Sequence, residues 1–382
     1  MKNGYLQPLT LCFLIFPFCA SSQQTTAIYK RDTLITNNLS IDNDFFLGIF
    51  GLSRLNFDRD YTMGLSYMHG RNYVTCPAMY QPLHWFNKLL RKQDLIQDSL
   101  YHSWQVMNGS FTPADLRPAA IIENDRPYAA LTVLETTISR FDMESGRRRT
   151  AKLALGIIGT RISETIQTFL HNLLNHGDTM RPHTPKGWPN QISDKGEPTL
   201  LYSFQDEWIL GKRPFEEERK GLVQAKMGYK YSVGYFTSVG GVFEIRVGKI
   251  DHHNWFNDAN HLVDVNKYTS IAYKTAPGLR KEKSFREAYV FLSLMPNIVL
   301  YNALLNGQFE RSPHTANFSE TKHFVMEGDT GAGVTFYNRR NFRVHNFILR
   351  LSAQTPEYEF AGTAPRWHYW GGLEFNWWKI KR

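Results

Sequence analysis

The sequence lacks an apolar run long enough to form a transmembrane helix. Such a helix needs about 20 consecutive apolar residues, and the apolar segment near the start, Leu9 to Phe18, is much shorter than that. A helical membrane protein is therefore excluded. A chain that crosses a membrane without such helices must form a closed β-barrel, because only that alternative pairs every backbone polar group inside lipid.

The common catalytic motifs are also missing. The chain contains no Gly-x-Ser-x-Gly, no His-Glu-x-x-His and no glycine-rich phosphate loop. These absences exclude the usual signatures of α/β-hydrolases, zinc peptidases and P-loop nucleotidases. Internal repeats and low-complexity linkers are absent too, so we predict a single domain. Any chemistry must come from local clusters of residues.

The first residues have the pattern of a secretory signal peptide. Lys2 supplies the positive charge, Leu9 to Phe18 the apolar segment, and Ala20-Ser21-Ser22 the small residues of a cleavage site. This order is typical of export signals. We predict a signal peptide over residues 1–22 and an outer-membrane β-barrel domain over residues 23–382.

Composition agrees with an exported barrel. Aromatic residues make up 14% of the chain and the mean hydropathy is −0.40, as expected when one face of each strand meets lipid and the other a polar interior. The net charge of +9 falls to +8 when Lys2 leaves with the signal. A modest basic excess suits a partner that carries phosphates, such as lipopolysaccharide. Nucleic acid is not expected as a partner, and the oligomeric state is left open.

Alternation of apolar and polar residues predicts strands in four segments. In the last of them, five large apolar side chains share one parity, although Trp370 and Trp378 interrupt the pattern. An edge strand of a soluble sandwich with so many aromatics would promote aggregation, whereas membrane barrels carry aromatic girdles. The pattern predicts an all-β, transmembrane antiparallel barrel and favours it over a secreted β-sandwich. The segments are Tyr61–Tyr67, Ala288–Leu294, Phe342–Leu351 and Trp367–Trp377.

Two further segments favour short loop helices. The first, His84 to Gln97, is basic, and the second runs from Ser163 to Asn175. The second has an apolar stripe through Ile166 and Leu170 and a polar stripe through Gln167 and His171, which indicates an amphipathic helix. A helix that interrupts a barrel pattern should lie in a loop, where functional residues often occur.

A cluster of oxygen donors, Asp42-Asn43-Asp44, lies near the predicted start of the mature chain. Carboxylate and amide oxygens suit Ca²⁺, although acidic triplets are also common in turns. A regular strand would send Asn43 and Asp44 to opposite faces. Both residues can serve one site only if the strand ends or bulges between them.

Taken in order, these clusters resemble the outer-membrane lipid A 3′-O-deacylase family. The resemblance covers about the first half of the predicted mature chain. No single motif is specific, but six motifs in the same order are. They are Asn43-Asp44, the segment Asp58 to Gly64, the segment Asp125 to Ala129, the strand Leu155 to Gly159, Gln167 with His171, and Gly187-Trp188 with Gln191.

The resemblance implies a calcium-dependent hydrolase that removes the 3′-linked acyloxyacyl chain of lipid A, on a barrel of about twelve strands. Asn43, Asp44, Thr62 and His171 fall on active-site positions of that family. By their chemistry, Asn43 and Asp44 would hold Ca²⁺, His171 would take a proton from water and Thr62 would position substrate or water.

The resemblance also suggests substrate-binding residues, for which we choose Arg117, Arg126 and Gln167. Gly177 falls where the family has an acidic residue, with Asp178 beside it. Two other hypotheses remain open from the sequence. The chain could be a transport or structural barrel without catalytic activity, or a soluble secreted β protein.

Overall fold

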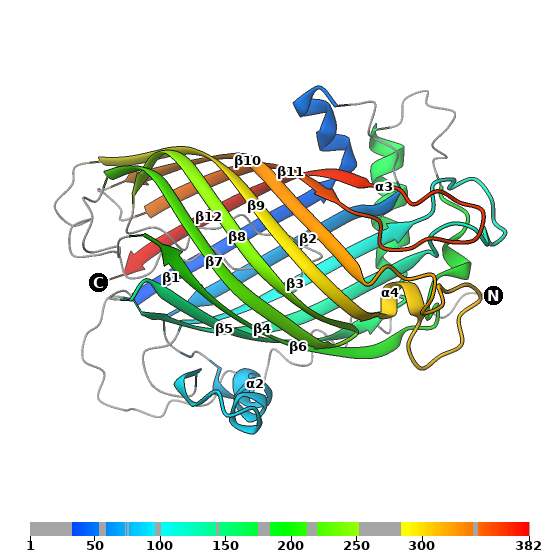
Figure 1. Cartoon of the computed structure of the whole chain (residues 1–382), viewed down its shortest axis with the longest axis horizontal. Helices are drawn as coiled ribbons and strands as arrows, with labels where there is room; N and C mark the ends of the chain where they lie inside the picture. Colours follow the sequence, from blue (N-terminus) through cyan, green and yellow to red (C-terminus); the bar gives the residue numbers. More distant parts are fainter. Residues whose placement is uncertain are drawn as a thin grey trace.

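The computed structural model describes residues 33–52, 59–72, 74, 76–95, 101–142, 145–174, 184–211, 220–251, 284–338 and 343–381. Within these residues, twelve antiparallel strands pair in sequence order, and β12 pairs with β1 to close a barrel (Figure 1). The predicted all-β fold is confirmed. The strands are β1 (Thr33–Asn43), β2 (Asp60–Arg71), β3 (Tyr101–Thr112), β4 (Ala129–Asp142), β5 (Arg147–Ile158), β6 (Glu197–Leu210), β7 (Lys220–Gly234), β8 (Phe236–Asp251), β9 (Ser284–Asn302), β10 (Phe324–Asn338), β11 (Arg343–Gln354) and β12 (His368–Lys381).

Short helices occupy the connections between strands. The predicted helix over Ser163 to Asn175 is observed as α3, and the one predicted over His84 to Gln97 begins earlier. Pro77 starts that helix, as proline does well in a first helical turn, and Leu89 ends it. No helix in the described part of the chain is long and apolar enough to cross a membrane. The helices are η2 (Asp44–Phe50), α2 (Pro77–Leu89), η4 (Gln93–Leu95), α3 (Ile162–Leu174), η5 (Trp188–Asn190) and α4 (Ala303–Asn306).

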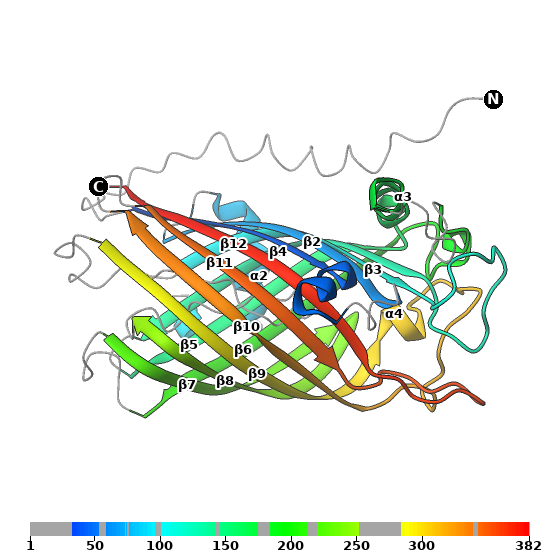
Figure 2. The ribbon, with the colours of Figure 1, turned by 90° about the horizontal axis from the view of Figure 1, so that it is seen from above.

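The two ends of the barrel differ. One end, here called the terminal end, holds the start of β1 and the finish of β12 (Figure 2). The other, here called the mouth end, carries η2, α3, η5 and α4. In Figure 1, η2 and α3 project next to each other from one side of the barrel, and α2 projects from the opposite side.

The outer wall of the barrel is apolar over most of its surface. Alternate residues of each strand expose side chains such as Leu39, Leu65, Val106 and Phe347. In β12 the odd-numbered aromatics face outward, as the sequence pattern predicts. Trp370 breaks that pattern because it points inward, where its ring lies 5.4 Å from that of Tyr61.

The interior is filled with paired charges. Arg148 and Glu207 form an ion pair in which each side chain is 1% exposed, and Lys152 binds Glu135 at 3.1 Å. Arg350 pairs with the buried carboxylate of Asp42. Such pairing is needed because an unpaired buried charge is costly. These pairs occupy the lumen with protein side chains.

Candidate active site

The chain turns sharply where β1 ends at the mouth. Asn43 is the last residue of the strand, and its side-chain Oδ1 accepts a hydrogen bond from the backbone N–H of Phe45 at 2.8 Å. Its Nδ2 donates to the carbonyl of Thr62 on β2 at 2.9 Å. Asn43 therefore caps η2, as asparagine does well, and fixes it to the neighbouring strand. Because the strand ends here, the side chains of Asn43 and the buried Asp44 need not point to opposite faces of the wall.

The third member of the acidic triplet lies elsewhere. Asp42 points into the lumen, where it binds Arg350 and accepts a hydrogen bond from Tyr61 at 3.3 Å. The structure thus separates Asp42 from the two residues that follow it. Asn43 lies at the outer side of the wall, and Asp44 is the first residue of η2.

η2 is packed on the outer face of β12. Gly371, which pairs with Asn43 across the strands, leaves room for Phe46. A Cβ atom at Gly371 would lie 2.6 Å from the Cβ of Phe46, far closer than carbon atoms approach in a packed structure. A glycine is therefore required here for η2 to hold its position.

A row of polar side chains crosses the outer wall beside η2. A bulge in β2 interrupts its register with β3 between Tyr61 and Met63. Thr62 forms a 2.6 Å hydroxyl–hydroxyl hydrogen bond with Thr112. Ser110 and Asn108 continue the row along β3, on the same parity as the exposed Val106. All four of these polar residues are buried although they occupy lipid-facing positions, so something must cover them. We call Thr62, Asn108, Ser110 and Thr112 the outer-wall polar row.

The cover is α3, which buries a row of its polar side chains against the wall. Ser163, Gln167 and His171 succeed one another at four-residue spacing and are buried, at 0%, 2% and 8% exposure. Ser163 donates to Oδ1 of Asn108 at 3.3 Å and so joins the helix to the polar row. Phe169, on the other side, is 63% exposed. The rest of the described helix surface is mixed, since Thr165 and Asn172 are exposed as well and Ile166 is half-buried.

Three of the sequence motifs meet at one buried tryptophan. The indole Nε1 of Trp188 donates to Oε1 of Gln167 at 3.0 Å, and its ring lies 5.0 Å from that of Tyr128. A side chain at Gly187 would overlap the Tyr128 ring. Trp188 thus fixes α3 one turn before His171. This contact gives Gln167 a positioning role, and its Nε2 has no partner among the described residues.

The Leu155–Gly159 motif closes the turn that leads into α3. Gly159 has φ +79°, and its N–H donates to the carbonyl of Ala130 at 2.8 Å. A Cβ there would overlap the backbone of Ser193. Only glycine satisfies both the backbone angle and the close approach.

The Asp125–Arg126 pair closes the inside of the mouth. Arg366 donates to the carboxylates of Asp60 and Asp125, and Tyr358 donates to Asp60 at 2.7 Å. Burial, helped by the nearby Asp60 carboxylate, raises the pKa of the Tyr358 hydroxyl well above its ordinary range, so it remains a donor. Arg126 is 1% exposed, pairs with Glu357 and lies 4.4 Å from the Phe111 ring centroid.

These features invite comparison with known proteins. The sequence profile of the family described as "Outer membrane protein LpxR" matches residues 8–378. The chain belongs to this family. Membership agrees with the closed barrel and places this LpxR-family protein in the bacterial outer membrane. The structure resembles "LpxR from Salmonella typhimurium" with a TM-score of 0.63 and 14% identity, over 89% of this chain and 99% of that one.

Other comparisons add little. A BamA structure from Haemophilus ducreyi aligns with a TM-score of 0.27 and 8% identity, over 91% of this chain and 70% of that one. A TodX monoaromatic hydrocarbon channel mutant aligns with a TM-score of 0.26 and 6% identity, over 92% and 90%. Both scores are too low to support an argument. A search of curated protein sequences gives no match.

Within this LpxR-family barrel, the predicted site residues divide into two groups. Asn43, Thr62, Gln167 and His171 lie on the outer side of the wall or in the helix that covers it, and Asp44 directly follows Asn43. Arg126 lies inside the mouth. Arg117 is exposed in the loop after β3, where it binds Asp115 at 2.8 Å. Gly177, Asp178 and the signal segment 1–22 lie outside the described residues.

The outer-wall polar row was not predicted from the sequence. The signal was present, because Asn108, Ser110 and Thr112 share the parity of Val106, which faces lipid. Three polar residues in succession at lipid-facing positions contradict the apolar-out rule of membrane barrels. Such a local contradiction marks a covered or functional surface.

The donors around Asn43 fit a hard cation in type. Asn43, Asp44 and Thr62 offer only oxygen ligands, which Ca²⁺ prefers. The Oγ of Ser110 is buried and has no partner among the described residues. The same part of the chain contains no group of three His, Cys, Asp or Glu residues arranged for a metal. Any calcium site here must therefore draw on amide, hydroxyl or carbonyl oxygens.

Proposed function

We propose that this protein is a lipid A deacylase that hydrolyses the ester of the 3′-linked acyloxyacyl chain. One observation carries the proposal, namely that α3 buries Ser163, Gln167 and His171 against the polar row on the outer wall. A site on the outside of a barrel is reached sideways from the membrane. Its natural substrate is a lipid rather than a solute that passes through the lumen.

The mouth end would face the cell exterior. β1 begins and β12 finishes at the same end of the barrel, the terminal end. A barrel inserted from the periplasm keeps these segments on the periplasmic side, because neither needs to cross the membrane. The polar row then lies at the level of the outer leaflet, where lipid A resides. Exposed Phe169 would contact its acyl chains.

His171 would act as the general base. Its imidazole would take a proton from a water molecule as that water attacks the ester carbonyl carbon. The imidazolium would then return the proton to the sugar oxygen as the acyl–oxygen bond breaks, so the products are a free acid and a sugar hydroxyl. Gln167, held by Trp188, positions the helix for this transfer. Thr62 and Ser110 offer hydroxyl groups for orienting water or substrate.

Asn43 and Asp44 would hold Ca²⁺. When bound, this ion would polarise the ester carbonyl and stabilise the negative charge that develops on its oxygen. Asn43 keeps one lone pair of Oδ1 beyond its bond to Phe45. The carboxylate of Asp44 would be the negatively charged ligand of the ion. The hydrogen bond from Asn43 to β2 holds Asn43 beside Thr62.

The alternative of a transport barrel is less well supported. Two ion pairs, Arg148 with Glu207 and Lys152 with Glu135, are buried on the lumen side of the neighbouring strands β4, β5 and β6. A water-filled channel would instead leave such side chains exposed. The buried ion pairs on the lumen side therefore favour a barrel whose active site lies on its outer wall.

Lipid A mass spectrometry tests the proposal. The protein would be expressed in a Gram-negative host whose lipid A keeps its 3′-linked acyloxyacyl chain. The expected result is a new lipid A species that lacks this chain, together with the released fatty acids. Lipid A that is unchanged in cells with a heat-modifiable, correctly folded barrel would contradict the proposal and favour a non-catalytic barrel.

A further inference from the structure

α2 lies against the outer wall near the terminal end. Its residues Tyr80 and Leu83 are buried against outward-facing side chains of β4, β5 and β6, among them Ile138, Leu153 and Tyr202. The ring of Phe86 stacks on that of Tyr202 at 5.6 Å. The helix therefore covers a lipid-facing part of the wall, at the end of the barrel opposite to α3.

The other face of α2 is exposed and amphipathic. Trp85 is 60% exposed and Leu89 is 62% exposed, and Lys88 between them is exposed as well. Arg91 follows directly after the helix and is also exposed. Tryptophan, leucine and basic residues on one helix face are typical of helices that lie at a membrane–water interface.

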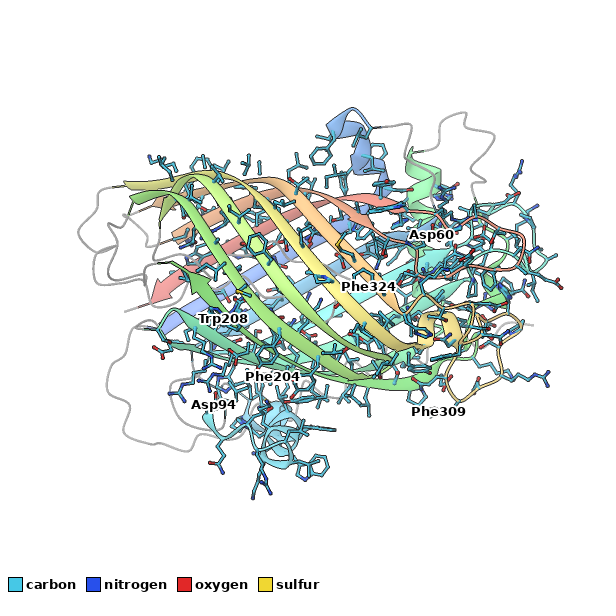
Figure 3. The ribbon with its side chains drawn as sticks, in the orientation of Figure 1. Asp60, Asp94, Phe204, Trp208, Phe309 and Phe324 are labelled. Carbon is cyan, nitrogen blue, oxygen red and sulfur yellow. The ribbon has the colours of Figure 1, made fainter. Side chains whose placement is uncertain are left out.

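Basic side chains gather on the wall beside this helix. Arg140 and Arg149 are directly opposite each other on β4 and β5, an arrangement that repulsion between like charges disfavours. Arg147 lies one outward position further along β5. Lys92 places its Nζ 3.7 Å from the centroid of the Phe204 ring. Phe204 and Asp94 are labelled in this region of the wall in Figure 3. We call these four basic residues, together with the exposed Lys88 and Arg91 of α2 and the turn after it, the terminal-end basic cluster.

Acidic residues compensate only part of this charge. Asp94 binds Arg149, and Asp206 binds Arg147. Asp142 is opposite Arg147 in the strand register. Among the described residues, six basic side chains thus face three acidic ones. The guanidinium of Arg140 donates a hydrogen bond to the backbone carbonyl of Asp94, at 3.5 Å.

We propose that the terminal-end basic cluster binds the phosphate groups of anionic phospholipids in the periplasmic leaflet, with α2 lying in the interface of that leaflet. The excess of basic side chains favours an anionic ligand. The lipid-facing wall and the exposed Trp85 and Leu89 indicate an anion attached to acyl chains. The terminal end faces the leaflet that is built of phospholipid if the mouth faces the exterior. Hydrolysis at the mouth is not needed for this binding.

Lipid retention on the purified barrel tests the proposal. The full barrel in a non-ionic detergent would be equilibrated with phosphatidylglycerol, cardiolipin or phosphatidylcholine, and bound lipid would be measured by native mass spectrometry. Each basic residue near an anionic surface contributes about fivefold in affinity, so Arg140→Gln/Arg149→Gln should weaken phosphatidylglycerol binding about thirtyfold. Added salt should weaken it as well.

A matched control lies on the other side of the same end. Arg343 and Lys379 are also a basic pair directly opposite each other, on β11 and β12, and Arg343→Gln/Lys379→Gln should leave retention unchanged. If the first double variant fails to fold, Lys88→Gln/Arg91→Gln at exposed positions should show the same loss.

The outcomes separate the possible ligands. Retention of phosphatidylglycerol and cardiolipin over phosphatidylcholine, lost only in the cluster variants, supports the proposal. Stronger retention of cardiolipin would show that the cluster spans two phosphates. Equal retention of phosphatidylcholine, undiminished binding in both cluster variants, or equally tight binding of soluble glycerol 3-phosphate would overturn it.

Discussion

Gly371→Ala tests whether the position of η2 determines activity. The added Cβ would lie 2.6 Å from the Cβ of Phe46, whereas packed carbon atoms lie about 3.5–4.0 Å apart. Phe46 and the 3-10 helix must therefore move by about 1 Å. Asp44 begins that helix, so it moves too. A misplacement of about 1 Å can cost about a hundredfold in rate, or about 2.7 kcal/mol of transition-state stabilisation.

The assay is the initial rate of acyl-chain release from lipid A in outer-membrane vesicles. Barrel closure is checked by heat-modifiable mobility on gels, since the strand pairing of Gly371 with Asn43 does not need η2. Gly328→Ala is the control, because its nearest neighbour would lie at an ordinary 3.5 Å. A folded Gly371→Ala barrel with a near-normal rate would refute the role assigned to η2.

Three further predictions concern the anchor, the ion and the mouth. Trp188→Phe replaces the indole by a smaller ring and leaves Oε1 of Gln167 buried without its donor, a cost of about 1–3 kcal/mol, so deacylation should fall at least about tenfold in a barrel that still shows heat-modifiable mobility; an unchanged rate would contradict the anchoring role. Chelation should abolish hydrolysis, and Ca²⁺ should restore it better than Mg²⁺, whose octahedral demand is stricter; full activity in excess chelator would rule out the ion. Arg366→Gln removes the cation that Asp60 and Asp125 share, so it should lower the stability of the barrel by about 2 kcal/mol, discounted because Arg366 is 26% exposed, and with it the heat-modification temperature; an unchanged temperature would show that the mouth cluster is not structural.

The alternation of residues was sufficient to predict the barrel. Segments such as Tyr61–Tyr67 and Ala288–Leu294 lie within β2 and β9. Alternation is reliable there because one face of each strand meets lipid along its whole length. The bounds of α2 were predicted less well, since Pro77 begins the helix seven residues before the predicted start.

The grouping of the site residues needed the structure. The sequence indicates that Gln167 and His171 share a helix face, but it does not reveal that this polar face is the buried one. Arg126 and Asn43 both lie near the mouth, yet one points into the lumen and the other lies on the outer wall. That difference depends on strand parity and on the bulge at Thr62, which local patterns do not specify.

The most direct test of the central claim compares two histidines on the outer side of the barrel. His171 lies on the buried face of α3 at the mouth, whereas His345 lies on β11 near the terminal end and stacks on Phe375. His171→Ala should lower the rate of lipid A deacylation at least about a hundredfold, the scale of general-base catalysis, and the barrel should still show heat-modifiable mobility. His345→Ala should retain its activity. Near-normal deacylation by a folded His171→Ala barrel would contradict the account.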